Sequence, residues 1–147
     1  MSKKHFKLMP AVWLIFIKDN QILLLKRKNT GWQDNKYSVP AGKLDGNETV
    51  MQAAVREAKE EIGLNIKIDN SDVIHVLHKK NDDNEETIDF FIKVNNWKNT
   101  PKNMEPHKCE ELKWNPINNL PQNTIDCLKY VINQIGKNIF YSEYGWK

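Results

Sequence analysis

One stretch of 23 residues, GKLDGNETVMQAAVREAKEEIGL at 42–64, constrains this chain more than any other. Glu57, Glu60 and Glu61 follow one another at helical spacing, and glycines stand at both ends. In an α-helix this spacing places the three carboxylates on one face, about one turn apart. Like charges so placed cost a helix about 0.2–0.5 kcal/mol per pair, and a divalent cation between them offsets that cost. Because Mg²⁺ and Mn²⁺ prefer carboxylate oxygens, the stretch predicts a metal-binding helix face.

Capping signals indicate where the predicted helix begins and ends. Asn47 is a suitable N-cap, because its side-chain oxygen can accept a bond from a free backbone N–H. Glu48 then lies near the positive end of the helix dipole. Gly63 suits the position after the last helical residue, where a left-handed backbone is common. We therefore expect a loop over residues 40–46, a helix over residues 48–62 and a stop at Gly63.

The same residues form a motif of fixed spacing. Gly42 is followed after five residues by Glu48, and after a further seven residues by the run REAKEEIGL at 56–64. This pattern resembles a complete Nudix box, the signature of the Nudix hydrolases. A solvated acidic helix would explain REAKEE alone, but it does not explain the flanking residues at these distances. The resemblance implies a pyrophosphohydrolase of nucleoside diphosphate-linked compounds that needs Mg²⁺ or Mn²⁺ as its cofactor.

The resemblance also implies roles for individual residues of the box. Arg56 is expected to pair with Glu48 and to hold the loop against the helix. The expected metal ligands are three carboxylates and one backbone carbonyl oxygen, those of Glu57, Glu60, Glu61 and Gly42. The three glutamates are also the expected catalytic residues, and Glu60 is either a ligand or the general base. In the family a glycine often stands where this chain has Ala41, which is a minor difference.

A second informative stretch lies closer to the C-terminus. The run PKNMEPHKCE at 101–110, followed by Trp114, resembles the MutT-like branch of the family. That branch includes enzymes that hydrolyse nucleoside triphosphates, oxidised ones among them. The run supplies further carboxylates for the metal or for a general base. We expect Glu105 to be catalytic, because MutT-like enzymes carry an acidic residue in this loop, and Glu110 is the alternative.

Cationic and aromatic residues outside these motifs are candidates for holding the substrate. The run KRK at 26–28 is either a solvated strand end or a cationic rim, in which Arg27 grips phosphate oxygens. Lys43, directly after the glycine that begins the box, is a second cationic candidate. For the nucleobase we expect an aromatic side chain, and Trp32 is the first candidate. Trp114 is another, although core packing explains it better.

The remaining sequence alternates strand and helix patterns. Apolar runs bounded by turn residues predict strands at residues 11–18, 22–25, 37–42, 66–68, 73–77 and 87–94, with another ending at Trp114. A last helix starts at Asn123 or Thr124 and ends at Gly136. Its apolar stripe comprises Ile125, Leu128, Ile132 and Ile135. Interleaved strands and helices predict an α/β fold. The resemblance implies its Nudix form, an α/β/α sandwich with a mixed β-sheet between the helices.

Length and composition limit the other possibilities. A chain of 147 residues has room for one core, and we expect a single Nudix hydrolase domain over residues 1–147. The net charge of +3 is too mild to indicate nucleic-acid binding. The apolar run within residues 3–17 is too short to span a bilayer, so we interpret it as a strand. Cys109 and Cys127 lack metal-ligand spacing, which indicates free thiols and a cytoplasmic protein, with one disulfide between them as the alternative.

Two features leave alternatives open. The tail over residues 138–147 is rich in aromatic side chains, and it either packs back on the body or forms a homodimer contact. His75 and His78 are typical of ordinary histidines at a strand end, because no third ligand for a metal is found nearby.

The function that best fits these patterns is hydrolysis of a nucleoside triphosphate, canonical or oxidised, to a monophosphate and pyrophosphate. Within the family, the alternatives are ADP-ribose, a dinucleoside polyphosphate, a pterin triphosphate or a prenyl diphosphate. Outside it, a non-catalytic nucleotide-binding module would be expected to lose box carboxylates, and all are present here. An RNA pyrophosphohydrolase or decapping enzyme would benefit from a broad basic surface, which the charge does not predict.

Overall fold

The first strand lies at the centre of the fold because both of its faces are apolar. β1, Met9–Lys18, buries the whole run 11–16 in a computed structural model that describes residues 3–147. Successive side chains of a strand point to opposite faces. One core cluster accordingly contains Val12, Leu14 and Phe16, and the other contains Trp13 and Ile15.

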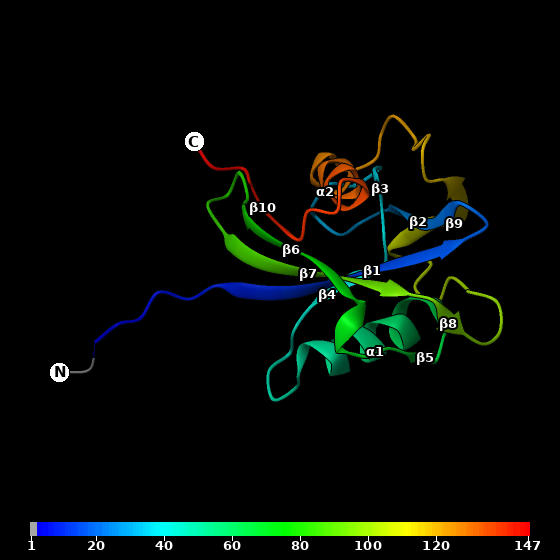
Figure 1. Ribbon diagram of the computed structural model, residues 1–147, viewed down its shortest axis with the longest axis horizontal. Helices are drawn as coiled ribbons and strands as arrows, with labels where there is room; N and C mark the ends of the chain where they lie inside the picture. Colours follow the sequence, from blue (N-terminus) through cyan, green and yellow to red (C-terminus); the bar gives the residue numbers. More distant parts are fainter. Residues whose placement is uncertain (1–2) are drawn as a thin grey trace.

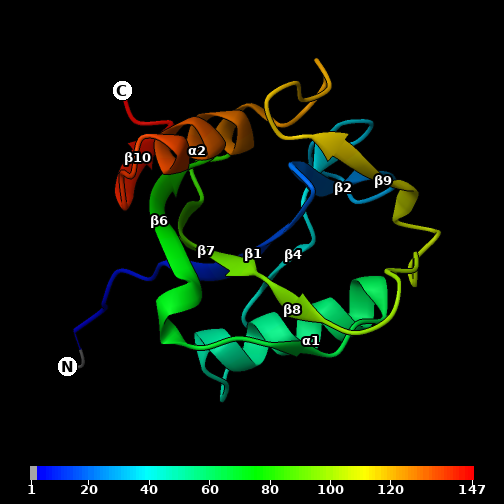
Figure 2. The same cartoon turned by 45° about the vertical axis from the view of Figure 1, so that its right-hand side comes forward.

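Two helices cover the two faces of the sheet that β1 divides. α1, Val50–Ile62, packs on the first cluster, and α2, Asp126–Gly136, packs on the second. Figures 1 and 2 show the helices on opposite sides of the strands. The other elements are β2 (Gln21–Arg27), β3 (Tyr37–Ser38), β4 (Ala41–Lys43), β5 (Ile66–Lys67), η1 (Asn70–Asp72), β6 (Val73–Lys80), β7 (Glu86–Val94), β8 (Asn96–Trp97), β9 (Cys109–Pro116) and β10 (Tyr141–Tyr144).

The sheet is mixed, as expected. Its strand order is β10-β6-β7-β1-β2-β3, with β4 also paired to β1 and β9 to β2. β1 runs parallel to β7, and β10 runs parallel to β6, while the other pairs are antiparallel. A separate two-stranded sheet joins β5 to β8. The expected α/β/α sandwich with a mixed sheet between helices is therefore confirmed.

The hairpin between β1 and β2 is tight, and its strands then diverge. Asp19 and Asn20 have φ values of 52° and 61°, which suits the two-residue turns whose central residues both need a positive φ. The two strands pair only next to this turn, at Ile17 with Ile22 and at Lys18 with Gln21. Beyond it, β1 pairs with β4, and β2 pairs with β3 and β9. This divergence separates the two halves of the sheet beside the predicted site.

The helix α1 begins two residues later than expected. Thr49, not Asn47, is the N-cap, and it forms a capping box with Gln52 that satisfies two backbone donors. Asn47 has a left-handed backbone with φ 55°, which an N-cap does not adopt. Glu48 consequently lies in the loop and not in the first helical turn. The expected stop at Gly63 is confirmed, because that residue is left-handed with φ 69° and its N–H bonds to the carbonyls at the helix end.

The start of α2 also differs from the expectation. Ile125 is the N-cap and makes no side-chain capping bond. The predicted caps are engaged elsewhere: Thr124 Oγ1 donates to Pro121 O at 2.7 Å, and Asn123 Nδ2 donates to Asn35 O at 3.0 Å. All four residues of the predicted stripe contact the second core cluster: Ile125 and Leu128 are buried in it, and Ile132 and Ile135 are partly buried against it. Cys127 and Val131 are buried beside them.

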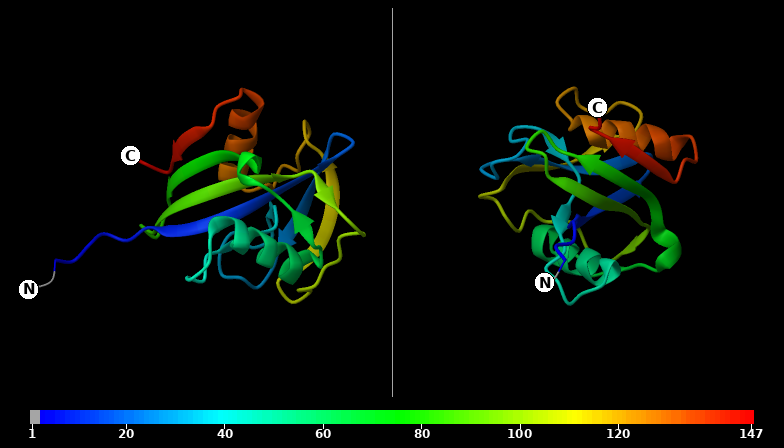
Figure 3. Two further views of the ribbon diagram at one scale, coloured as in Figure 1. Left: turned by 60° about the horizontal axis from the view of Figure 1, so that its bottom comes forward. Right: turned by 90° about the vertical axis from the view of Figure 1, so that its left-hand side faces the viewer.

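The aromatic tail packs back on the body by adding a strand to the sheet. β10 pairs with β6 at the sheet edge (Figure 3). The buried His75 anchors it, with Nε2 lying 2.6 Å from Ser142 Oγ and Nδ1 lying 2.9 Å from Ile139 O. Trp146 Nε1 also donates to His78 O at 3.1 Å. Neither β10 nor the short β8 was predicted from the sequence.

Two further expectations can be compared with the structure. Cys109 and Cys127 are both free and buried. Between residues 3 and 147, no helix has the length and apolar character that crossing a bilayer requires.

The left-handed backbone of Gly63 at the end of α1 leads to a prediction about stability. We expect Gly63→Ala to lower the free energy of unfolding by about 1–2 kcal/mol, because an L-residue is disfavoured at this backbone conformation. The added methyl would also lie 3.2 Å from Met104 Sδ. Urea unfolding followed by circular dichroism measures the change.

Gly136→Ala is the matched control. Gly136 ends α2, is not among the glycines with a positive φ, and has open space around its Cα. Alanine is the better helix former, so this variant should be as stable as the wild type or more so. Equal destabilisation of both variants would contradict the role given to Gly63.

Candidate active site

The acidic face of α1 lines a cavity beside the box loop. The cavity has a volume of about 380 Å³, and its walls include Glu57, Glu60 and Glu61 of the helix together with Gly42 of β4 and Glu105 of the loop before β9. Glu57 is 9% exposed, whereas Glu60 is exposed. Oε2 of Glu61 is buried and has no hydrogen-bond partner. The three helix carboxylates thus reach one cavity, as their spacing predicted.

Burial makes the negative charge on two of these carboxylates costly. It raises the pKa of Glu61 well above its usual range, and the neighbouring charges of Glu57 and Glu105 raise it further. Burial likewise raises the pKa of Glu57, although the guanidinium of Arg56 opposes the shift. Desolvated carboxylates close to one another are stabilised in their charged form when a cation lies among them.

Arg56 holds the loop before α1 against the helix. Its Nη2 and Nε bind the two oxygens of Glu48 at 2.8 and 3.1 Å, and its Nη1 donates to Glu57 Oε1 at 2.7 Å. A fourth hydrogen bond runs from Nη2 to Lys43 O at 3.2 Å. The expected pair with Glu48 is therefore present. The guanidinium also lowers the pKa of the Glu48 carboxyl to about 2.

Position 42 requires a glycine, because the carboxylate of Glu57 occupies the space where a side chain would lie. A Cβ built on Gly42 would lie 2.1 Å from Oε1 and 2.6 Å from Oε2 of Glu57. No other residue would allow this close approach of backbone and carboxylate. The backbone at Gly42 is consequently within reach of any ion that the carboxylate holds.

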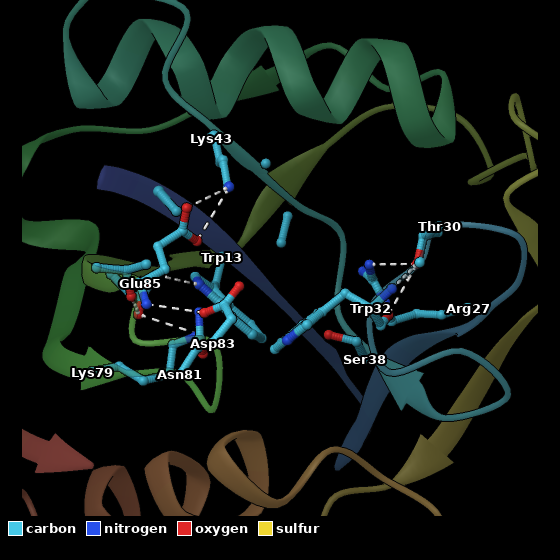
Figure 4. Close-up of a pocket in the computed structure, with 16 residues that line it drawn as sticks. Trp13, Arg27, Thr30, Trp32, Ser38, Lys43, Lys79, Asn81, Asp83 and Glu85 are labelled. Carbon is cyan, nitrogen blue, oxygen red and sulfur yellow. Dashed lines mark hydrogen bonds and ion pairs between the residues drawn. The ribbon is translucent and has the colours of Figure 1, made fainter. Parts of the chain in front are cut away.

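A second cavity, of about 420 Å³, adjoins the first. The two share Arg27, Thr30, Ala41 and Gly42 among their lining residues. Figure 4 shows Arg27, Thr30 and Trp32 on one side, and Asn81, Asp83 and Glu85 from the β6–β7 hairpin on the other. The first cavity therefore contains the carboxylates of α1, and the second combines two tryptophans with charged side chains of both signs, with Gly42 between the two cavities.

The predicted substrate-binding residues lie around the second cavity. Arg27 donates from Nε to Trp32 O at 2.8 Å and from Nη2 to Thr30 Oγ1 at 2.9 Å, and its guanidinium lies 5.0 Å from the Trp32 ring centre. Arg27 thereby orders the loop that carries Trp32, while it also lines both cavities. Lys43 Nζ forms an ion pair with Glu85 at 3.2 Å across the rim (Figure 4).

The three carboxylates of residues 101–111 have different surroundings. Glu105 lines the first cavity with the helix glutamates. Glu110 pairs with Lys26 at 3.4 Å, and Glu111 accepts a bond from Tyr37 Oη at 2.7 Å. Trp114 stacks on Trp97 against the core and lines neither cavity, so core packing explains it.

Sequence reasoning missed the floor of the second cavity. Trp13 Nε1 donates to Asp89 Oδ1 at 3.1 Å, Thr87 Oγ1 donates to Asp89 Oδ2 at 2.8 Å, and Lys79 Nζ lies 3.9 Å from the same carboxylate. Burial raises the pKa of Asp89, against the opposing effect of Lys79. The available signal was Asp89 itself, an acidic residue inside the otherwise apolar run DFFI.

The donor atoms of the first cavity fit a hard divalent cation. Across the described residues 3–147, no three or more Asp, Glu, His or Cys side chains are arranged as a ready cluster of ligands. The unpartnered Oε2 of Glu61 and the carboxylate oxygens of Glu57, which lie against Gly42, are nevertheless oxygen ligands of the kind that Mg²⁺ and Mn²⁺ take. The metal ligands stay a prediction.

Comparison with known proteins decides the family. Residues 7–133 match the NUDIX domain family. This chain belongs to the Nudix family. A MutT NUDIX hydrolase from Burkholderia pseudomallei has the same fold, with a TM-score of 0.80, 24% identity and coverage of 88% of this chain and 98% of that one. A MutT protein from Methanosarcina mazei Go1 superposes with a TM-score of 0.79 at 15% identity, over 92% and 97% of the two chains.

Curated Nudix relatives carry two different substrate names. An 8-oxo-dGTP diphosphatase from Proteus vulgaris is 33% identical over 99 residues, which is 67% of this chain and 84% of that protein. An ADP-ribose pyrophosphatase from Methanocaldococcus jannaschii is 44% identical over 70 residues, or 46% of this chain. The latter match spans only 41% of the relative's length. The predicted resemblance to MutT-like Nudix hydrolases is confirmed.

The pairing of Glu48 with Arg56 makes a pH-dependent prediction. Glu48 has a pKa of about 2 in the folded protein, below the ordinary value of 4.5, so the charged form favours folding. This contribution is complete above about pH 5 and is lost as the pH falls towards 2. We expect Glu48→Gln to be less stable than the wild type at pH 7 and equally stable near pH 2, by urea unfolding at each pH.

Glu110→Gln is the matched control, since Glu110 makes one half-exposed ion pair with Lys26. Pairs of this kind contribute little to stability. A difference between wild type and Glu48→Gln that is constant from pH 7 to pH 2 would contradict the assignment.

Proposed function

We propose that this protein is a metal-dependent pyrophosphohydrolase that converts a nucleoside triphosphate, canonical or oxidised, to a nucleoside monophosphate and pyrophosphate. The observation that carries the proposal is the unpartnered, buried carboxylate oxygen of Glu61 in a cavity that joins an aromatic one at Gly42. The first cavity suits a metal-bound diphosphate, and the second suits a nucleoside. The 8-oxo-dGTP diphosphatase activity of the Proteus vulgaris relative supports this substrate class.

The carboxylates of α1 would hold the cation. Glu57 and Glu61 are the proposed principal ligands because both are desolvated and lie one turn apart, with Gly42 O and Glu60 completing the set. A bound Mg²⁺ or Mn²⁺ supplies charge neutralisation at phosphate oxygens and lowers the pKa of a water molecule. Arg56 positions Glu57 and the loop, while Arg27 and Lys43 face the phosphates from the rim.

Glu105 is the proposed general base. It shares the cavity with the helix carboxylates but comes from the opposite loop, where it can accept a proton from an attacking water molecule. Addition of that water across the bond between the α- and β-phosphates yields the monophosphate and pyrophosphate. Glu60 is the alternative base. Glu110 is less suitable, because it points to Lys26 on the surface.

ADP-ribose is the second candidate substrate. The Methanocaldococcus jannaschii relative named for that activity is 44% identical over the segment it shares with this chain. ADP-ribose also contains a diphosphate linked to a nucleoside, so the same carboxylates would serve it. An assay distinguishes the two candidates: the protein is incubated with each compound and Mg²⁺, and the products are identified by mass.

We also propose the cytoplasm as the working compartment, because Cys109 and Cys127 are free thiols, as expected under reducing conditions. A homodimer stays a prediction. The tail packs on β6, but Phe140 and Tyr141 remain 56% and 48% exposed.

The first functional prediction concerns Glu57. We expect Glu57→Gln to lower kcat/KM for the best substrate of a panel of nucleoside triphosphates, 8-oxo-dGTP and ADP-ribose by about 100-fold or more, since a metal contributes several kcal/mol to the transition state. Isothermal titration of Mg²⁺ with product nucleotide present should show weaker uptake. Glu143→Gln, in β10 and bound to Tyr141 Oη, is the control that should keep full activity. Turnover of Glu57→Gln at the wild-type rate would remove the metal role.

The second functional prediction separates the two candidate bases. Glu105→Gln should lower kcat by about 100- to 10,000-fold, the usual contribution of a general base, while Glu110→Gln keeps its activity. If Glu110→Gln is the impaired variant, the assignment of the two residues is wrong.

A further inference from the structure

Lys79 is a buried lysine whose hydrogen-bond donors are unused. Its side chain is 6% exposed, and within residues 3–147 its ammonium donates no hydrogen bond. The nearest carboxylate oxygen, Asp89 Oδ2, lies 3.9 Å away and already accepts a bond from Thr87. Among residues 3–147, the buried side-chain atoms that lack a partner are Glu61 Oε2 and His78 Nε2, so the Lys79 ammonium is not sealed in the core but opens on the cavity that the residue lines.

Two indole rings hold this ammonium in place without using its donors. Lys79 Nζ lies 5.5 Å from the ring centre of Trp13 and 4.9 Å from that of Trp32. Such cation–π contacts are favourable but do not replace directional hydrogen bonds. Because Lys79, Asp89 and both tryptophans line the second cavity, the unused donors are available to a molecule that occupies it.

The surroundings of Lys79 favour a neutral acceptor over a phosphate. Asp83, Glu85 and Asp89 line the same cavity and offset the positive charges of Arg27, Lys43 and Lys79, so the lining has no excess charge that would attract an anion. The half-buried indole of Trp32 offers a flat base an apolar wall. The carboxylates that suit a metal-bound diphosphate line the other cavity, beyond Gly42. A substrate with its phosphates there therefore presents its nucleobase to Lys79.

We propose that Lys79 donates a hydrogen bond to a carbonyl oxygen of the substrate's nucleobase, and that this residue makes the enzyme select oxo bases, such as guanine, 8-oxoguanine or uracil, over amino analogues. The inference rests on the proposed function, since it takes a nucleoside triphosphate as the substrate. Lys79 is thus a specificity-determining residue that contacts the base. It takes no part in the proton transfer or in holding the metal.

Matched substrate pairs test the proposal. dGTP and the deoxynucleoside triphosphate of 2,6-diaminopurine differ in one carbonyl oxygen that becomes an amino group, and dUTP and dCTP differ in the same way. A third pair, 8-oxo-dGTP and dGTP, adds one carbonyl oxygen. For at least one pair, the wild type should prefer the oxo member by about 10- to 100-fold in kcat/KM, the range expected for one hydrogen bond to a charged donor.

Lys79→Met is the test variant, because methionine keeps an unbranched apolar stem and removes the donors. It should abolish the preference by slowing the oxo member alone. Lys80→Met is the matched control, since Lys80 follows on the same strand and its ammonium lies over Trp146 instead. Thermal unfolding of each variant shows that the fold is kept. An unchanged preference, or an equal loss for both members of every pair, would overturn the proposal.

A binding measurement separates this inference from the proposed function. The monophosphates of guanine and 2,6-diaminopurine deoxynucleosides can be titrated without metal, with quenching of the tryptophan fluorescence as the signal. Preference for the guanine compound in wild type and its loss in Lys79→Met support the role of Lys79 even if no triphosphate is hydrolysed. Hydrolysis without any preference in either measurement would leave the proposed function intact and refute the inference.

Discussion

The contact between a backbone and a carboxylate, Gly42 against Glu57, is the constraint on which the rest of the site depends. The missing side chain lets the box loop lie directly on the helix, and Arg56 fixes the arrangement by bonding to the loop and to the helix at once. The guanidinium opposes the rise in pKa that burial causes at Glu57, whereas Oε2 of Glu61 has no hydrogen-bond partner. The protein alone does not balance the charge here, and a cation would complete it.

The same loop joins the chemistry to recognition. Because β1 and β2 separate beyond their hairpin, β4 can pair with β1 and place Ala41 and Gly42 between the two cavities. Arg27 leaves β2 at this opening and orders the loop of Trp32 through two hydrogen bonds. A divergence in strand pairing thus fixes the distance between the carboxylates and the aromatic wall. Nucleotide hydrolysis requires such a fixed distance between phosphate and base sites.

The sequence predicted features that belong to a single element, but not contacts between elements that lie far apart in the chain. Carboxylate spacing and the glycine at position 63 are properties of one helix, so the acidic face and the helix end followed from periodicity and backbone preference. The start of α1 was misplaced because the loop takes a left-handed residue at Asn47, which propensity alone does not show. Trp13, Lys79 and Asp89 meet only because β1, β6 and β7 pair, and no single segment contains that information.

Lys79 and Asp89 lie on the sheet where α2 no longer covers it. On β7, Phe91 lies in the core under α2, and two residues earlier on the same face stands Asp89. On β6, Leu77 lies in that core, and two residues later stands Lys79. One face therefore changes from apolar core to polar cavity floor within a single side-chain step on both strands. An apolar run such as DFFI predicts burial on both faces, whereas the structure buries Asp89 and Phe91 on one face and leaves Ile88 and Phe90 half-buried on the other. On the buried face, Phe91 packs in the core under α2, and Asp89 lines the cavity.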